Sequence, residues 1–159
     1  MNTAVIVHPK LAQACFENAI RPLLTTPEVF EKLGIKLLSY SFPFLDLQLD
    51  WHATNRSILL RVDGTDFPYR PVGGWWIDPQ GNVLLPGGSG VPNSLGFHVP
   101  NPPHRPNCWF CFLGWREYHD HPSHQDRSWA SLRTDPRYSV LQLVLQLQRD
   151  LNKPGTGVA

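Results

Sequence analysis

Charged side chains are scarce in this sequence, since Asp, Glu, Lys and Arg make up 17% of its 159 residues. Positive and negative charges nearly cancel, leaving a formal net charge of +1, and the lysine and arginine residues form no basic run. A protein that binds nucleic acid through counterion release needs a strong local excess of positive charge. We therefore expect no nucleic-acid partner. The length and the 42% hydrophobic content predict a single globular domain over residues 1–159.

Long apolar runs and a cysteine framework are also missing. No apolar stretch approaches the roughly 18 residues of a membrane span, and the N-terminal segment lacks the basic and continuously apolar regions of a signal peptide. The chain has three cysteines, Cys15, Cys108 and Cys111, which is not the even set of a disulfide framework. We expect no membrane association and a reducing cytoplasm, where a Cys-x-x-Cys pair is more often metal-binding or catalytic than structural.

The first part of the chain has a helical pattern over residues 11–33. Its expected buried stripe consists of Leu11, Cys15, Ala19, Leu23 and Leu24. Pro22 is predicted to break or kink this helix, and Thr26-Pro27-Glu28 to begin a second short helical turn. Gly34 is then expected to end the helical region.

Four β-strands are predicted next, at residues 35–42, 44–51, 57–62 and 73–78. In the second strand, Leu45, Leu47, Leu49 and Trp51 share one face because strand side chains alternate. The connections are too short to hold crossover helices, so the strands should form an antiparallel meander. A loop rich in proline and glycine follows, with a possible hairpin at Gln80-Gly81-Asn82.

The last part is again helical. Asp135 is a candidate N-cap, with Pro136 at the first helical position and a stop at Pro154-Gly155. The expected core stripe is Val140, Leu141, Val144, Leu147 and Leu151. The order of elements predicts an α+β domain, with a four-stranded antiparallel sheet flanked on one side by N-terminal and C-terminal helices.

Residues 104–124 hold two of the three cysteines and four of the seven histidines. A cysteine thiol is nucleophilic even when only a few per cent is thiolate. Histidine can serve as a general base or, in its neutral form, as a donor to an oxyanion. In a strand, Cys108 and Cys111 would face opposite sides, so they are not expected to act at one point while the strand is regular.

The order of motifs along most of the chain resembles that of ubiquitin-conjugating enzymes. The strand "SILLRV" is followed by "FPYRPV" at a position where that family has a Tyr-Pro turn, and "HVPN" and "HRPN" stand where it has His-Pro-Asn. "FCFLG", Trp129 and "VLQLVLQLQRDLNKP" then follow in the family's order of catalytic cysteine, tryptophan and amphipathic helix. In the residue inserted into each tripeptide and in the histidines after the cysteine, the chain is most similar to divergent bacterial members of the family.

This resemblance implies a ubiquitin-conjugating fold and a transferase without a cofactor. Its partners would be a ubiquitin-like protein, an activating enzyme that supplies it, and a protein substrate. The spacing from Asn101 favours Cys108 as the nucleophile, but the apolar neighbours Phe110 and Phe112 favour Cys111, which we take as the catalytic residue. The other implied catalytic residues are Asn101, His119, His121 and His124.

Two other functions fit the same residues. Cys108 and Cys111 with two of His119, His121 and His124 would make a Cys₂His₂ zinc set, with Cys108, Cys111, His119 and His124 as one choice. The gap between Cys111 and His119 is shorter than in a zinc finger, so a finger fold is not expected. Alternatively, the chain is a non-catalytic member of the same fold that binds a ubiquitin-like partner.

Overall fold

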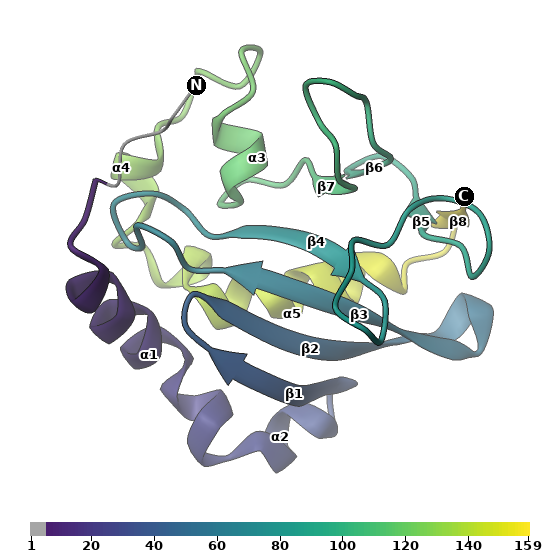
Figure 1. The fold of residues 1–159 in the computed structure, drawn as a ribbon, viewed down its shortest axis with the longest axis horizontal. Coiled ribbons are helices and arrows are strands. Elements are labelled where there is room, and N and C mark those ends of the chain that lie inside the picture. Colours follow the sequence, from purple (N-terminus) through teal and green to yellow (C-terminus); the bar gives the residue numbers. More distant parts are fainter. Residues whose placement is uncertain (1–5) are drawn as a thin grey trace.

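The computed structural model describes residues 6–159 and has an α+β architecture (Figure 1). The helices of more than four residues are α1 (Pro9–Thr25), α2 (Pro27–Glu31) and α5 (Val140–Leu151). The shorter helical segments are η1 (His52–Thr54), α3 (Arg116–His119), α4 (Trp129–Leu132) and η2 (Pro136–Tyr138). None of the helices in this part of the chain is long and apolar enough to cross a bilayer.

The main sheet has four antiparallel strands in the order β1-β2-β3-β4. These are β1 (Ile35–Ser41), β2 (Phe44–Trp51), β3 (Arg56–Asp63) and β4 (Gly73–Ile77). The predicted meander is therefore confirmed, with strand bounds within two residues of those expected. Two small antiparallel pairs complete the fold: β5 (Pro92–Asn93) with β8 (Gly157–Val158), and β6 (Phe97–His98) with β7 (Trp109–Phe110).

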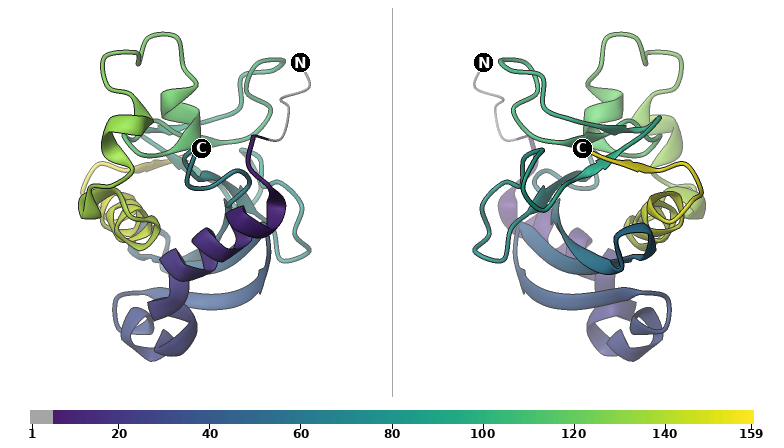
Figure 2. Two further views of the ribbon diagram at one scale, coloured as in Figure 1. Left: turned by 90° about the vertical axis from the view of Figure 1, so that its left-hand side faces the viewer. Right: turned by 90° about the vertical axis from the view of Figure 1, so that its right-hand side faces the viewer.

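One face of the main sheet carries the core. The alternation predicted for β2 is correct, because Leu45, Leu47, Leu49 and Trp51 are all buried. Helix α5 crosses behind the sheet and α1 packs beside it, as Figures 1 and 2 show. The predicted stripe of α5 is buried, together with Leu143.

Helix α1 presents a face to the core that differs from the expected one, although Leu23 is buried as predicted and Ala19 is partly buried. The buried residues are Ala12, Phe16, Ile20 and Leu23, whereas Leu11 and Leu24 are exposed and Cys15 is only partly buried. The prediction of Cys15 as a core residue is wrong. Phe16 sets the rotation of the helix about its axis. Its ring fills the space above Gly64, where a Cβ would come within 2.6 Å of the ring. A helix rotated to bury Leu11 would leave this space empty.

Two predictions at helix ends also need correction. Pro22 does not end α1, which continues to Thr25, and the carbonyl of Pro22 accepts hydrogen bonds from the N–H and Oγ1 of Thr26. Asp135 does not cap the C-terminal α-helix. Its carboxylate accepts from the N–H of Arg137 and caps the short segment η2, and Ser139 is the N-cap of α5.

We expect the core face of β2 to dominate the stability of the fold. Leu47→Ala removes a side chain that is 0% exposed and should lower the free energy of unfolding by about 2 to 5 kcal/mol. Leu38→Ala is the matched control on β1, where the side chain is 43% exposed, and should cost less than about 1 kcal/mol. Urea denaturation of both variants measures the difference, and equal losses would contradict this assignment of the core.

Candidate active site

Cys111 comes directly after the short strand β7, whose position is set by aromatic packing. Phe110 is fully buried and its ring contacts those of Trp76 and Trp115, with centroid distances of 5.0 and 5.1 Å. The N–H of Cys111 donates to the carbonyl of Gly96 at 2.8 Å. The anchored phenylalanine and this hydrogen bond hold Cys111 at the end of the strand, where it is partly exposed.

His124 lies against this cysteine. Its Nε2 is 3.2 Å from the Sγ of Cys111, within the range of a sulfur hydrogen bond. The imidazole stacks on Tyr118 with a centroid distance of 4.0 Å and an interplanar angle of 11°. Burial raises the pKa of the Cys111 thiol, and the positive charge of Arg105 acts in the opposite direction. The thiol is therefore largely protonated at neutral pH, and His124 is placed to accept its proton.

Cys108 has a different environment. It is 1% exposed, and its Sγ is 3.6 Å from the carbonyl oxygen of Leu84. Burial raises the pKa of this thiol to about 11, so almost no thiolate exists at neutral pH. The two cysteines thus face different surroundings, Cys108 in the core and Cys111 at the surface.

His119 and His121 do not contact Cys111 in the way that His124 does. The Nε2 of His119 accepts the N–H of Gly114 at 3.1 Å, and burial lowers the pKa of this half-buried imidazole. The Nδ1 of His121 lies 2.7 Å from the Oγ of Ser123. The two histidines do not lie on a strand, because His119 ends helix α3 and His121 lies in the bend that follows it.

Asn101 is exposed and makes its contacts through the backbone. It exchanges two hydrogen bonds with Arg105, at 2.7 and 2.9 Å, which close the loop before β7. The zinc alternative would need ligands around Cys108, whose sulfur faces the core. Within residues 6–159, no three His, Cys, Asp or Glu side chains are grouped so that they could hold a metal ion.

Arg105 and Glu117 were not anticipated from the sequence. The guanidinium of Arg105 lies over the Trp109 ring at 4.8 Å and donates to the carbonyl of Glu117 at 3.0 Å. One carboxyl oxygen of Glu117 accepts the N–H of Gly74 at 3.4 Å, and the other is buried without a partner among the described residues. Burial raises the pKa of Glu117 to about 7. No sequence pattern marks this carboxyl as buried, because it lies in a polar segment.

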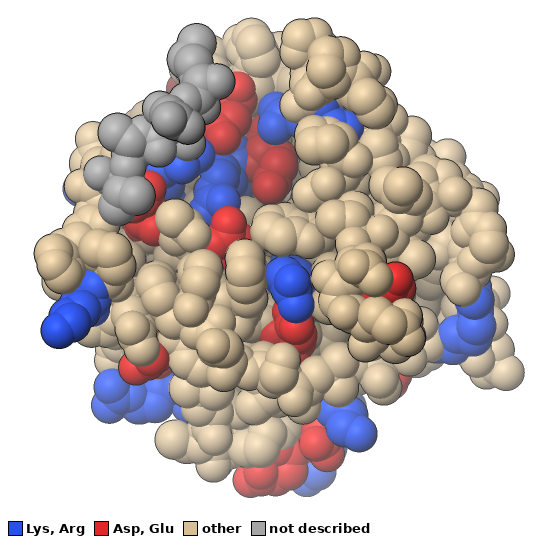
Figure 3. All heavy atoms as spheres, viewed as in Figure 1, with Lys and Arg blue, Asp and Glu red and all other residues tan. Residues whose placement is uncertain are grey.

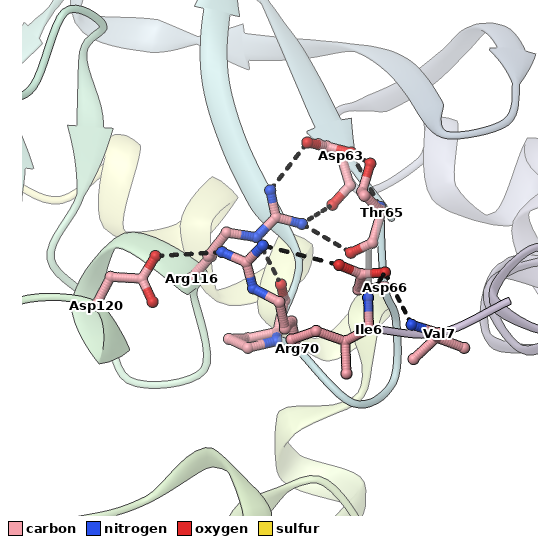
Figure 4. A network of polar contacts seen from close by, with 9 residues as sticks. Ile6, Val7, Asp63, Thr65, Asp66, Arg70, Arg116 and Asp120 are labelled. Carbon is pink, nitrogen blue, oxygen red and sulfur yellow. Dashed lines mark hydrogen bonds and ion pairs between the residues drawn. The ribbon is translucent and has the colours of Figure 1, made fainter. Parts of the chain in front are cut away.

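Helix α3, which carries Tyr118 and His119, is attached to the sheet by Arg116. Its guanidinium donates to the carboxylate of Asp63 at 2.9 Å and to the carbonyls of Asp63, Thr65 and Pro71 (Figure 4). Next to it, Arg70 pairs with Asp66 and with Asp120. Charged atoms accordingly gather over α3 and the connection from β3 to β4, whereas most of this face is uncharged (Figure 3). This network fixes the segment that leads to His124.

Two cavities reach the Cys111–His124 pair from different sides. The first, here called the Cys111 groove, has a volume of about 560 Å³ and is lined by Leu95, Gly96, Phe112, Lys153 and Pro154 as well as Cys111. The second has a volume of about 390 Å³ and is lined by His124 and His119, and by Arg70, Arg127 and Arg133. We call it the arginine pocket. The two share no lining residue, because Cys111 lines the groove and His124 lines the arginine pocket.

Comparisons with known proteins add nothing to this geometry. No protein-family model matches the chain, and no curated protein matches it. The function is therefore inferred from the residues and their arrangement.

The buried carboxyl of Glu117 should make stability depend on pH. In the folded protein it keeps its proton up to about pH 7, whereas in the unfolded chain it loses the proton near its usual value of 4.5. Folding therefore takes up a proton between these values, and this contribution to stability is lost as the pH rises through them. Glu117→Gln does not titrate, so it should gain stability relative to the wild type, by a few kcal/mol, between about pH 5 and about pH 8.

Urea denaturation of both proteins across this range measures the effect. The matched control is Glu28→Gln, which removes an exposed carboxyl in the first turn of α2 and should follow the wild-type profile. Parallel profiles for wild type and Glu117→Gln would contradict the buried, protonated state of this carboxyl.

Proposed function

We propose that this protein is a conjugating enzyme for a ubiquitin-like protein, of the kind found in bacterial modification pathways. In this proposal Cys111 accepts the modifier as a thioester from an activating enzyme and passes it to an amine. The observation that carries the proposal is the 3.2 Å contact between the Sγ of Cys111 and the Nε2 of His124, at a partly exposed position. The general order of the fold supports it, with a helix, an antiparallel meander, a long loop before the cysteine and a closing helix.

The pair can perform both acyl transfers. During loading, His124 takes the proton of the Cys111 thiol while the sulfur attacks the thioester carbonyl of the modifier. The bond to the activating enzyme's sulfur then breaks, and His124 returns the proton to that leaving sulfur. During discharge, an amine nitrogen attacks the same carbonyl and gives up a proton to His124. The bond between the carbonyl carbon and Sγ then breaks, and the cysteine sulfur leaves.

The Cys111 groove fits the end of an extended chain. The Phe112 ring packs directly on Gly96, where a Cβ would come within 2.5 Å of it, so glycine at this position lets the ring form part of the groove wall. Leu95 is 97% exposed on the same wall. In this position the leucine offers a protein partner apolar surface that binding would bury next to the reactive sulfur.

The role of Cys111 predicts a specific pattern among cysteine variants. Cys111→Ala should abolish a reductant-sensitive adduct formed with activating enzyme, modifier and ATP. Cys111→Ser should form a more stable, oxygen-linked adduct, because an ester is less reactive than a thioester. Cys108→Ala is the control and should keep the adduct, although it removes a buried side chain. Non-reducing gel electrophoresis distinguishes these outcomes.

Two other outcomes of this test would change the proposed nucleophile or the proposed function. Loss of the adduct in Cys108→Ala but not in Cys111→Ala would mean that Cys108 is the nucleophile. If the adduct survives both substitutions, neither of these cysteines carries the modifier, and if the wild type forms no adduct, a binding module for a ubiquitin-like partner becomes the better proposal.

The contact with Cys111 selects His124 among the three histidines. His124→Ala should slow discharge to an amine on the order of a hundredfold, while loading falls less, because exchange between two thiols is nearly balanced in energy. His121→Ala is the matched control, since its ring lies 5.4 Å from that of His124 but its Nδ1 contacts Ser123. Single-turnover discharge of the preformed thioester measures both rates. A wild-type rate for His124→Ala would exclude a catalytic role for this histidine.

A further inference from the structure

The arginine pocket adjoins His124 and shares no lining residue with the Cys111 groove. Cys111 lines only the groove, and His124 lines only the arginine pocket. In the proposed reaction the modifier is bonded to Cys111, so its tail occupies the groove. The acceptor amine must approach the base that takes its proton, which is His124. The arginine pocket is therefore the cavity through which an acceptor reaches the pair.

The pocket carries an excess of positive charge. Arg70, Arg127 and Arg133 line it against one carboxylate, that of Asp120. Arg70 is already paired with Asp120, at 3.5 Å, and with the buried carboxylate of Asp66, at 3.9 Å. Arg127 and Arg133 are both exposed, and among the described residues neither has a carboxylate within ion-pair distance. Two guanidinium groups thus remain available to a ligand.

The chemistry of these groups selects anions. A guanidinium presents a planar fork of N–H donors that matches a carboxylate in a two-point hydrogen bond. Arg133 lies over the ring of Tyr69 at 6.0 Å, which limits its freedom. The nearby carboxylate of Asp126 acts electrostatically on Tyr118 and His119 but does not line the cavity.

Resting on the proposed function, we propose that the arginine pocket binds acidic side chains next to the acceptor amine. The enzyme would then transfer the modifier preferentially to lysines in acidic protein segments.

The test compares discharge of the preformed thioester to two peptides, one with a single lysine between glutamates and one with glutamines in their place. Each rate is normalised to discharge to methylamine. The wild type should prefer the acidic peptide by about tenfold at low salt, the expected size of one charge-assisted contact, and added salt should reduce this ratio. Arg127→Gln/Arg133→Gln should bring the ratio close to one.

The matched control is Arg21→Gln/Arg149→Gln. It removes the same charge from exposed positions on α1 and α5 that do not line the pocket, and it should keep the preference. A wild type without preference, or a preference that survives in Arg127→Gln/Arg133→Gln, would overturn the proposal.

Failure of the proposed function is distinguishable, because in that case no thioester forms at all. Fluorescence anisotropy of the same labelled peptides with the unloaded protein then tests the pocket alone. Tighter binding of the acidic peptide, lost in Arg127→Gln/Arg133→Gln but not in the control, supports the acidic-ligand site. Equal binding of both peptides overturns it.

Discussion

The candidate site depends on one partly buried arginine. Arg116 donates hydrogen bonds to the carboxylate of Asp63 and to three backbone carbonyls, one at the end of β3 and two in the connection from β3 to β4. A guanidinium removed from water needs all of its donors satisfied, and a charge left unpaired there would be costly. Because the acceptors lie on the sheet and the arginine on α3, their pairing forces this short helix against β4. Gly73 leaves room for it, since a Cβ there would come within 2.9 Å of Nη1.

A second constraint acts on the cysteine from the other side. Phe110 fills a space between Trp76 and Trp115, and Gly74 is needed beneath it, because a Cβ there would lie 2.8 Å from the Phe110 ring. The buried phenylalanine and the docked helix bring two irregular segments together. Cys111 follows the first and His124 follows the second. Backbone hydrogen bonds shape the second segment, and the packing of Phe110 and Arg116 against the sheet places the two segments together.

The environment of the pair also limits its chemistry. Burial raises the pKa of the Cys111 thiol, so the sulfur is not a permanently activated thiolate. Under the proposed function, such a thiol still exchanges with a thioester and is less open to oxidation than a thiolate. The two adjoining cavities differ in chemical character. The groove next to the sulfur is largely apolar, and the pocket next to the imidazole carries arginines.

The regular parts of the fold were predictable because their side chains repeat with the period of the element. Leu45, Leu47 and Leu49 alternate along β2, and their burial follows directly. The buried face of helix α1 was harder to predict. Leu11, Cys15 and Ala19 form one apolar line along the helix, and Ala12, Phe16 and Ile20 form another. Local periodicity cannot distinguish two such lines. The line that contains Phe16 is the buried one, because the Phe16 ring fills the space above Gly64.

At the candidate site, too, the sequence indicated the residue types, and the tertiary structure determined their arrangement. Sequence alone identified residues 104–124 and the reactive residue types in it, because thiols and imidazoles have their chemistry wherever they lie. It left two cysteines and three histidines as alternatives. The pairing of Cys111 with His124, across 13 positions, arises from contacts of Phe110 and Arg116 with distant strands. The burial of Glu117 and the grouping of Arg70 with Arg127 and Arg133 have the same origin. Such contacts have no period in the chain, so they exist only once the sheet and its helices have packed.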